Sequence, residues 1–284
     1  MLDCFLKGEM IMIKKFYTAK YDRVFKTILC DEDDKSLLQE FLSRLLKRKV
    51  EVVQFLRNEL PVQTVLERTK TVDVLVKADQ EYIHIELNSN MLAYLHNRNF
   101  AFFSSLYSKK AHRGENYDLE TKYLHIDLTY GMKSEEEQIS YYIQSNKEVK
   151  YVENIEIIEY NMDKLMGYWY NNNEEKIQEY KHLIMLDLET KGLKDLSKGD
   201  DFVSEFEDKI TKLNEQETFQ SLMTYEEDQK KILNTEKKIS FEEGRKESQI
   251  EIAKAMLKAG ETIEKIHQYT ELPVEEVNNL KSTG

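Results

Sequence analysis

The sequence has little glycine and proline, with 9 Gly and 2 Pro among 284 residues. This scarcity excludes collagen-like repeats and long Pro- or Gly-rich linkers. Apolar residues make up 40 % of the chain, which also contains 17 Tyr and 12 Phe. A chain of this size and aromatic content can bury a substantial core, so we expect a folded α/β protein rather than a disordered one.

Cysteine is nearly absent, because only Cys4 and Cys30 are present. One pair in a chain of this length makes neither a disulfide framework nor a metal-ligand pattern. Isolated thiols suit the reducing cytoplasm, where we place the protein. No apolar run approaches the roughly 18 residues that span a bilayer. Asp3, Lys7 and Glu9 interrupt the apolar start, so we expect neither a membrane span nor a secretory signal.

The net charge of −12 argues at first against a nucleic-acid partner. The distribution of the charge changes that conclusion. Residues 1–130 hold 20 Lys+Arg and 19 Asp+Glu, whereas residues 131–284 hold 21 and 34. The acidic excess therefore lies in the C-terminal half. The near-neutral N-terminal half can bind phosphate groups through a few well-placed cations.

The spacing of apolar residues predicts the order of helices and strands. The predicted strands are 51–56, 71–78, 82–88, 122–130 and 152–160, and the predicted helices are 18–30, 35–49, 91–113, 174–190 and 201–250. Gly260 is expected to end the last long helix. Two short helices then follow it to the end of the chain.

The strands 71–78 and 82–88 form a predicted hairpin with residues 79–80 as its turn. In that register Asp73 faces Glu86, on the face opposite the valines and isoleucines. Directly opposed β-carbons lie about 4.5–5.5 Å apart, so the two carboxylates repel each other. A divalent cation offsets this repulsion, and Mg²⁺ prefers oxygen ligands of this kind. Taken alone, the pattern also fits a solvated sheet face without function.

Four segments in order carry a resemblance to a known family: YDRVFKTILCDEDDKSLLQEFL, ERTKTVDVLVKADQEYIHIELN, RNFAFFSSLYSKKAHRGENYDLETKYLHIDL and IAKAMLKAGETIEKIHQYTELPVEEV. The sequence resembles the PD-(D/E)xK nuclease superfamily, in particular its branch of recombination-promoting nucleases or transposases. The resemblance implies an α/β, restriction-endonuclease-like core, in which helices flank a central mixed sheet of about four strands. We assign residues 15–235 to this core and residues 236–284 to a helical C-terminal extension.

The resemblance implies a metal-dependent DNA endonuclease, linked to recombination or mobile elements, that hydrolyses phosphodiester bonds with Mg²⁺-activated water. Mn²⁺ is expected to substitute for Mg²⁺. Asp73 and Glu86 match the family's metal ligands, and Asn88 stands at the position of its catalytic lysine. In this branch that position is usually a glutamine, but Asn88 is shorter and carries no transferable proton. The alternative is therefore a catalytically degenerate relative that binds nucleic acid or protein as a regulator.

Further residues are candidates for this site: Lys70, Lys26 and Asp22 match positions of the family pattern, and Arg98 lies on the predicted helix 91–113. Lys70, Lys26 and Arg98 are candidate contacts to DNA phosphates, and Asp22 is a candidate extra acid. A solvated lysine at the start of a strand is an equally good interpretation of Lys70, and a favourable helix-start charge is the simpler one for Asp22. His84 shares the acidic face, but histidines in strands are more often packed or hydrogen-bonded, so we leave it out of the site.

The C-terminal tail can be interpreted as a small helix-turn-helix. Its last helix, PVEEVNNLK, carries two glutamates and one lysine, which suits a DNA groove poorly. We expect instead a module for docking or homo-oligomerisation. The expected partner of the nuclease-like domain is DNA, and no membrane partner is expected.

Overall fold

The computed structural model describes residues 14–56, 59–60, 70–71, 73–108 and 121–282, with the backbone alone at 59–60 and 70–71. The chain divides into two compact units, Met1–Gln216 and Glu217–Gly284. The boundary expected at residues 235/236 falls inside helix α8, which runs unbroken over Glu217–Lys258. No glycine or proline marks the region around Gln216, so the sequence pattern gives no signal there.

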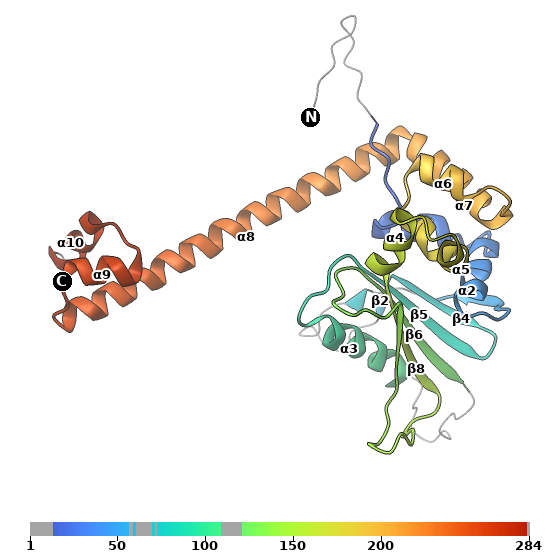
Figure 1. The fold of residues 1–284 in the computed structure, drawn as a ribbon, viewed down its shortest axis with the longest axis horizontal. Coiled ribbons are helices and arrows are strands. Elements are labelled where there is room, and N and C mark those ends of the chain that lie inside the picture. Colours follow the sequence, from blue (N-terminus) through green and yellow to red (C-terminus); the bar gives the residue numbers. More distant parts are fainter. Residues whose placement is uncertain (1–13, 57–58, 61–69, 72, 109–120, 283–284) are drawn as a thin grey trace, which may run out of the picture. The chain divides into compact units, whose positions relative to one another are not determined.

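A six-stranded mixed sheet in the order β1-β4-β5-β6-β8-β7 forms the centre of the first unit (Figure 1). Its strands are β1 Val52–Phe55, β4 Val74–Ala78, β5 Glu81–Asn88, β6 Lys122–Thr129, β7 Gln138–Tyr141 and β8 Ile155–Asn161. Strands β5, β6 and β8 run parallel to one another, and the other pairs are antiparallel. The sheet is larger than the four or so strands expected, because β1 and β7 extend its two edges. A separate ladder joins β2 (Glu59–Leu60) to β3 (Lys70–Thr71).

The β4–β5 hairpin has the predicted register. Val74 pairs with Ile85 and Val76 with Ile83, as a turn at residues 79–80 requires. The first strand starts later than expected, at Val74, so Asp73 lies just before the strand. Its Oδ2 accepts a hydrogen bond from the backbone N–H of Leu87 at 2.8 Å, which keeps Asp73 beside β5.

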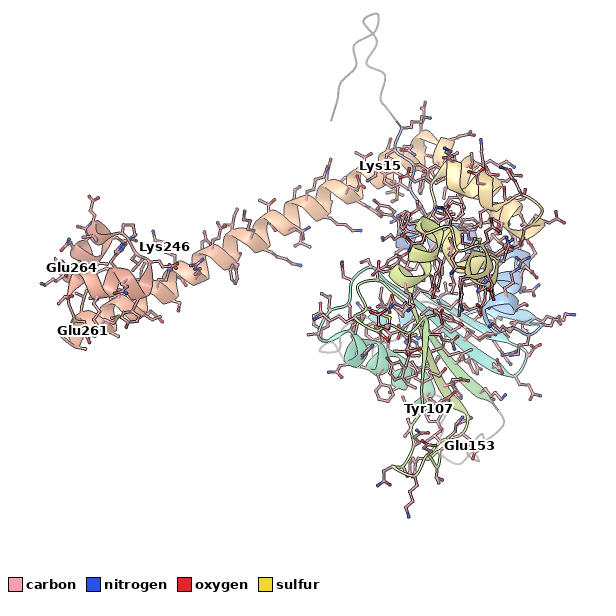
Figure 2. The ribbon with its side chains drawn as sticks, in the orientation of Figure 1. Lys15, Tyr107, Glu153, Lys246, Glu261 and Glu264 are labelled. Carbon is pink, nitrogen blue, oxygen red and sulfur yellow. The ribbon has the colours of Figure 1, made fainter. Side chains whose placement is uncertain are left out.

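Helix α3 (Leu95–Ser108) covers one face of the sheet (Figure 1). Its side chains Phe103 and Leu106 form a buried apolar cluster with Leu75, Tyr82, Tyr123 and Ile155 of the sheet. Tyr107, labelled in Figure 2, meets the ring of Tyr123 edge to face at a centroid distance of 4.9 Å. The polar face predicted for the hairpin is therefore not solvated, since α3 buries it.

The remaining helices of the first unit form a second layer. They are α1 Asp22–Leu29, α2 Ser36–Leu45, α4 Met162–Tyr170, α5 Glu174–Ile184, the 3₁₀ turn η1 Met185–Asp187, α6 Thr190–Leu196 and α7 Asp201–Glu215. Tyr160, on the sheet face opposite α3, donates its hydroxyl to the carbonyl of Leu45 at the end of α2. Phe25 of α1 and Phe41 of α2 meet edge to face. The sheet is thus enclosed on both faces, which explains why its central strands are almost wholly buried.

The second unit consists of α8, α9 (Ile263–Thr270) and α10 (Val274–Ser282). The end of α8 packs on the two short helices through Ala253, Ile266, Leu272 and Val277. Gly260, at φ +80°, follows the end of α8, as its position in the sequence predicts. Charged side chains such as Lys246 and Glu264 lie on the outside of this small bundle (Figure 2). Among the described residues, no helix combines the length and the apolar character needed to cross a membrane.

Candidate active site

The Asp73 carboxylate contacts Lys26 of helix α1. Lys26 Nζ on α1 lies 3.0 Å from Asp73 Oδ1, and it also lies 2.9 Å from Asp22 Oδ1, one helical turn earlier. Burial lowers the pKa of Lys26, but the charges of Asp73 and Asp22 outweigh it and hold that pKa above 10.5. Lys26 therefore stays charged and ties both carboxylates together.

The negative charge of Asp73 is nevertheless unfavourable. Burial, followed by the charges of Glu86 and Asp22, raises the pKa of Asp73 from 3.8 to about 7, although Lys26 and the Leu87 N–H act in the opposite direction. A shift of this size means that ionising Asp73 costs on the order of 4 kcal/mol more here than in water. The site therefore holds more negative charge than its own cations balance.

Glu86 is the second predicted acid, and it lies on β5 with 4 % of its surface exposed. His84 Nε2 is 2.9 Å from Glu86 Oε1. Arg98 Nη2, from helix α3, is 3.7 Å from Glu86 Oε2. The two oxygens thus have different partners, with Oε1 held tightly and Oε2 held loosely.

The Asn88 side chain connects β5, β6 and α3. Its Nδ2 donates to Asp127 Oδ1 at 2.9 Å and to Thr129 Oγ1 at 3.3 Å. Its Oδ1 accepts from Arg98 Nη2 at 3.0 Å and from Asn99 Nδ2 at 3.3 Å. Both amide hydrogens and both oxygen lone pairs are used within the protein. Asn88 therefore orients the side chains around it, including the guanidinium group of Arg98.

Strands β5 and β6 repeat one pattern, YIHIELN over residues 82–88 and YLHIDLT over residues 123–129. Their parallel register places equivalent residues side by side, with His84 beside His125 and Glu86 beside Asp127. Alternation sends all four of these side chains to the face that α3 covers. The repeat is the sequence signal that identifies Asp127 and His125 as members of the site.

A buried chain of hydrogen bonds links Glu86 to Asp127. His84 Nε2 contacts Glu86 Oε1, the two Nδ1 atoms of His84 and His125 lie 2.8 Å apart, and His125 Nε2 is 3.1 Å from Asp127 Oδ2. Burial, and then the neighbouring His125, lower the pKa of His84. Burial raises the pKa of Asp127, but His125, Asn88 and Asn99 outweigh it, so that the pKa lies below 3.8. The two imidazole rings therefore act as spacers that fix both carboxyl groups.

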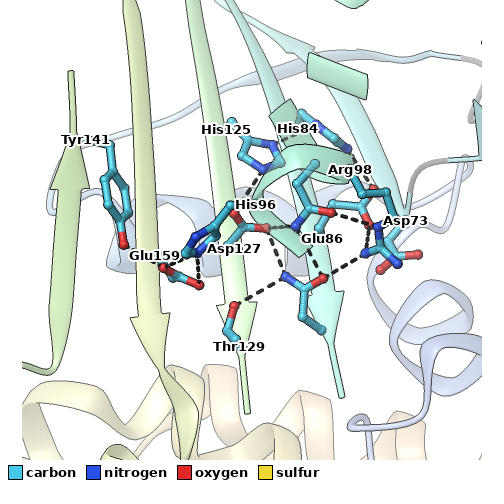
Figure 3. Close-up of polar contacts among 12 residues, drawn as sticks. Asp73, His84, Glu86, His96, Arg98, His125, Asp127, Thr129, Tyr141 and Glu159 are labelled. Atoms are coloured by element: carbon cyan, nitrogen blue, oxygen red, sulfur yellow. Dashed lines mark hydrogen bonds and ion pairs between the residues drawn. The ribbon is translucent and has the colours of Figure 1, made fainter. Parts of the chain in front are cut away.

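The acidic row continues across the sheet to β8, where Glu159 pairs in register with Asp127 (Figure 3). The Glu159 side chain is fully buried. His96 Nε2 lies 3.0 Å from Glu159 Oε2, and Tyr141 donates its hydroxyl to the same oxygen at 2.9 Å. Glu86, Asp127 and Glu159 thus occupy equivalent positions on three neighbouring strands, each with its own hydrogen-bonding partners.

The structure brings most of the predicted site residues together at one end of this row. Asp22, Lys26, Asp73 and Glu86 form its outer end, and Asn88 and Arg98 lie directly behind it. The Lys70 side chain lies outside the described residues, although the backbone of Lys70 belongs to β3. The members that the prediction missed are contributed by the neighbouring strands and by α3: His84, Asn99, His125, Asp127 and Glu159.

Asp73 and Glu86 are the residues suited to hold a divalent metal ion. In the part of the chain that the structure describes, no three or more His, Cys, Asp or Glu side chains gather closely enough to form a complete protein metal site. Two hard carboxylates with excess negative charge still fit Mg²⁺, which commonly binds one or two carboxylates and completes its shell with water and phosphate oxygens. The raised pKa of Asp73 supports this fit, because a dication relieves the repulsion that causes it.

Comparison with known proteins identifies the family of this chain. The model of a family described as "PD-(D/E)XK nuclease family transposase" matches residues 19–249, which is well over half of the chain. No curated protein and no solved structure matches. The match confirms the resemblance seen in the sequence, and the mixed sheet flanked by helices is consistent with the fold of these nucleases. The chain belongs to the PD-(D/E)XK nuclease family transposases.

Proposed function

We propose that this protein is a metal-dependent DNA endonuclease, with Mg²⁺ or Mn²⁺ held between Asp73 and Glu86. The family supports a role in nucleic-acid cleavage and mobile elements. The arrangement that supports the metal-dependent reaction is that of two carboxylates: Asp73 Oδ2 accepts from the Leu87 N–H at 2.8 Å, directly next to Glu86 on β5. Burial, and then the charge of Glu86, raise the pKa of Asp73 to about 7. When bound, a divalent cation polarises a phosphoryl oxygen and acidifies a bound water.

The neighbours of Asp73 and Glu86 have different roles in the proposed reaction. His84 occupies Glu86 Oε1, so Oε2 is the oxygen that would be available to hold a cation. The neighbouring Lys26 pairs with Asp73 Oδ1, and it would be free to contact a substrate phosphate if a bound cation balanced the charge of Asp73. Lys26 thus balances the charge of Asp73 in the metal-free site and would contact the substrate phosphate in the metal-bound site.

Arg98 supplies the positive charge that the asparagine at the lysine position lacks. Its Nη2 lies 3.0 Å from Asn88 Oδ1 and 3.7 Å from Glu86 Oε2, so the guanidinium group is held next to the metal-binding carboxylate. Its side chain is 38 % exposed and can reach a phosphate group from there. Asn88 thus acts by positioning Arg98, and Arg98 stabilises the charge that develops on the phosphate during cleavage.

Plasmid nicking tests this proposal directly. Wild-type protein should nick supercoiled DNA with Mg²⁺ or Mn²⁺ and should stop when EDTA is added. Asp73→Asn should abolish nicking, because the amide is a far weaker metal ligand. Asp79→Asn removes the same charge from the exposed hairpin turn and should leave nicking unchanged. Equal nicking by the Asp73 variant and wild type would overturn the assignment.

A catalytically silent regulator is the competing function. It is favoured by Asn88, whose amide is fully hydrogen-bonded at the position of the superfamily's lysine. Calorimetric titration with Mn²⁺ separates the two functions without measuring cleavage. A nuclease requires Mn²⁺ binding that Asp73→Asn removes, whereas a silent relative that has lost its metal site shows no such binding.

A further inference from the structure

A cavity of about 350 Å³ lies beside the acidic row, between the start of α3 and the edge strand β7. Its walls include three ring side chains, namely His96 and Phe100, one turn apart on α3, and Tyr141 on β7. Phe100 is 45 % exposed and Tyr141 37 %, so both rings present surface to an incoming ligand. The cavity is at the small end of the roughly 300–1,000 Å³ that ligand pockets occupy, which suits one planar ring system.

Glu159 holds two of the three walls in place. The rings of His96 and Tyr141 lie 5.9 Å apart, and both donate to the buried Glu159 carboxylate. A carboxylate buried this completely is costly unless hydrogen bonds satisfy it. The same bonds remove the rotational freedom of two half-exposed rings. The cavity is therefore organised before any ligand binds.

The floor of the cavity belongs to the candidate active site. Asp127 and His125 line it, and Asp127 is the in-register neighbour of Glu86 on the next strand. Neighbouring strands are about 4.8 Å apart, so Glu86 and Glu159 lie about 10 Å from each other across two strand spacings. A nucleic-acid strand whose phosphate lies at Glu86 can therefore place a base in this cavity.

We propose that this cavity binds a single unpaired nucleobase of the DNA that the site cleaves, an inference that rests on the proposed function. Aromatic walls bind a base by stacking, and stacking tolerates any base because each has a π-face. The polar atoms of the floor do not add base selectivity, since Asp127 is already bonded to His125, Asn88 and Asn99. The protein therefore prefers single-stranded or locally unpaired DNA over continuous duplex.

Two adjacent tyrosines provide a matched test. Tyr141 and Tyr142 are equally exposed, at 37 %, and each bonds a glutamate of β8, but Tyr142 lies outside the cavity and bonds Glu156 on the other face of the sheet. Binding of a fluorescein-labelled single-stranded oligonucleotide is measured by anisotropy with EDTA present, so that no cleavage occurs. The full-length variants Tyr141→Ala and Tyr142→Ala are compared with wild type, and Phe100→Ala provides a second change in the cavity wall.

Tyr141→Ala and Phe100→Ala should each weaken single-strand binding by about five- to 150-fold, the range expected for the loss of one base–aromatic stack. Tyr142→Ala should bind like wild type. An oligonucleotide of abasic residues should bind all four proteins with similar, weaker affinity. The proposal is overturned if the Tyr141 and Tyr142 variants bind normal DNA equally. It is also overturned if Tyr141→Ala loses as much affinity for the abasic oligonucleotide as for normal DNA, or if wild type binds no single strand.

This design separates the cavity from the cleavage chemistry. If wild type does not nick DNA with metal, but Tyr141→Ala and Phe100→Ala still weaken single-strand binding in EDTA and Tyr142→Ala does not, the nuclease proposal fails and the base-binding cavity stands. If wild type nicks DNA but the two tyrosine variants bind alike, the cavity proposal fails and the nuclease stands.

Discussion

Arg98 on helix α3 donates from Nη2 to the amide oxygen of Asn88 on β5, at 3.0 Å. This contact joins the asparagine at the family's lysine position to a cation from a different element. The same guanidinium group donates from Nε to Asn99 Oδ1 at 3.0 Å, so it is held from two sides. An arginine fixed in this way can donate hydrogen bonds to phosphate oxygens from its remaining N–H groups.

Replacing Arg98 should therefore reduce turnover more than substrate affinity. Arg98→Ala should lower kcat by about 10²–10³-fold, as loss of a preorganised transition-state donor does, while KM changes little. Arg98→Lys should restore part of the rate, because it keeps the charge but not the planar fork. Arg48→Ala is the matched control, since Arg48 pairs with Glu81 at the opposite end of β5. Similar kinetics for the Arg98 and Arg48 variants would contradict this role.

Asp73→Asn should abolish metal binding and also stabilise the metal-free protein. The folded-state pKa of Asp73, about 7, lies above its ordinary 3.8. The folded state therefore binds the proton more tightly, and stability falls as the pH rises from about 4 through 7. At pH 8 in EDTA, the variant should gain on the order of 4 kcal/mol in the free energy of unfolding relative to wild type, because it avoids the cost of ionising Asp73. Urea denaturation at pH 5 and pH 8 measures the difference.

The same denaturation experiment with Mg²⁺ provides the control. Added metal should raise the urea midpoint of wild type and narrow its gap to Asp73→Asn, because ligand binding to the native state alone is stabilising. The variant itself should respond little to Mg²⁺. If metal shifts both proteins equally, Asp73 is not a ligand of the ion that causes the shift.

The His84–His125 contact should couple the stability of two strands. Each ring bonds the other through Nδ1 and bonds a carboxylate through Nε2, all in the buried interior. His125→Leu removes the hydrogen-bond partner of His84 Nδ1 and of Asp127 Oδ2, which costs about 1–3 kcal/mol for each buried atom left unsatisfied. A double-mutant cycle with His84→Leu should show a coupling of about 1–2 kcal/mol. Strictly additive losses would mean that the Nδ1–Nδ1 contact contributes nothing.

The hairpin could be predicted because its information is local. Alternating side chains and a two-residue turn define one register, and the structure has that register from Val74 to Ala78. Strand β7 was missed since Gln138–Tyr141 is a short edge strand whose pairing with β8 is set by tertiary contacts. The sequence pattern gives no signal near Gln216, because a helix that follows another helix without glycine or proline leaves no break in the pattern.

Some residues of the candidate site can be identified from local sequence patterns, whereas others depend on tertiary packing. Asp73 and Glu86 follow from the hairpin and the family resemblance. Asp127 was visible in principle, because β5 and β6 repeat the same histidine-x-acid pattern. The contacts of Arg98 and Glu159 depend instead on where α3 crosses the sheet, and no spacing along the chain specifies that crossing.

His182 on α5 should make the protein acid-sensitive. Its ring meets Phe41 edge to face in the buried helical layer. Burial, followed by the charges of Arg44 and Lys47, lowers its pKa from 6.5 to about 3. The folded state thus keeps His182 neutral while the unfolded chain takes up a proton below pH 6.5, so stability present above pH 6.5 is lost as the pH falls toward 3. Between pH 7 and pH 5, this group should remove about 2 kcal/mol from the free energy of unfolding. All other titrating groups are the same in the two proteins, so the free energy of unfolding of His182→Gln should fall by about 2 kcal/mol less than that of wild type over this interval. Urea midpoints measured against pH test this. Parallel curves for the two proteins would show that His182 is protonated without penalty in the folded state.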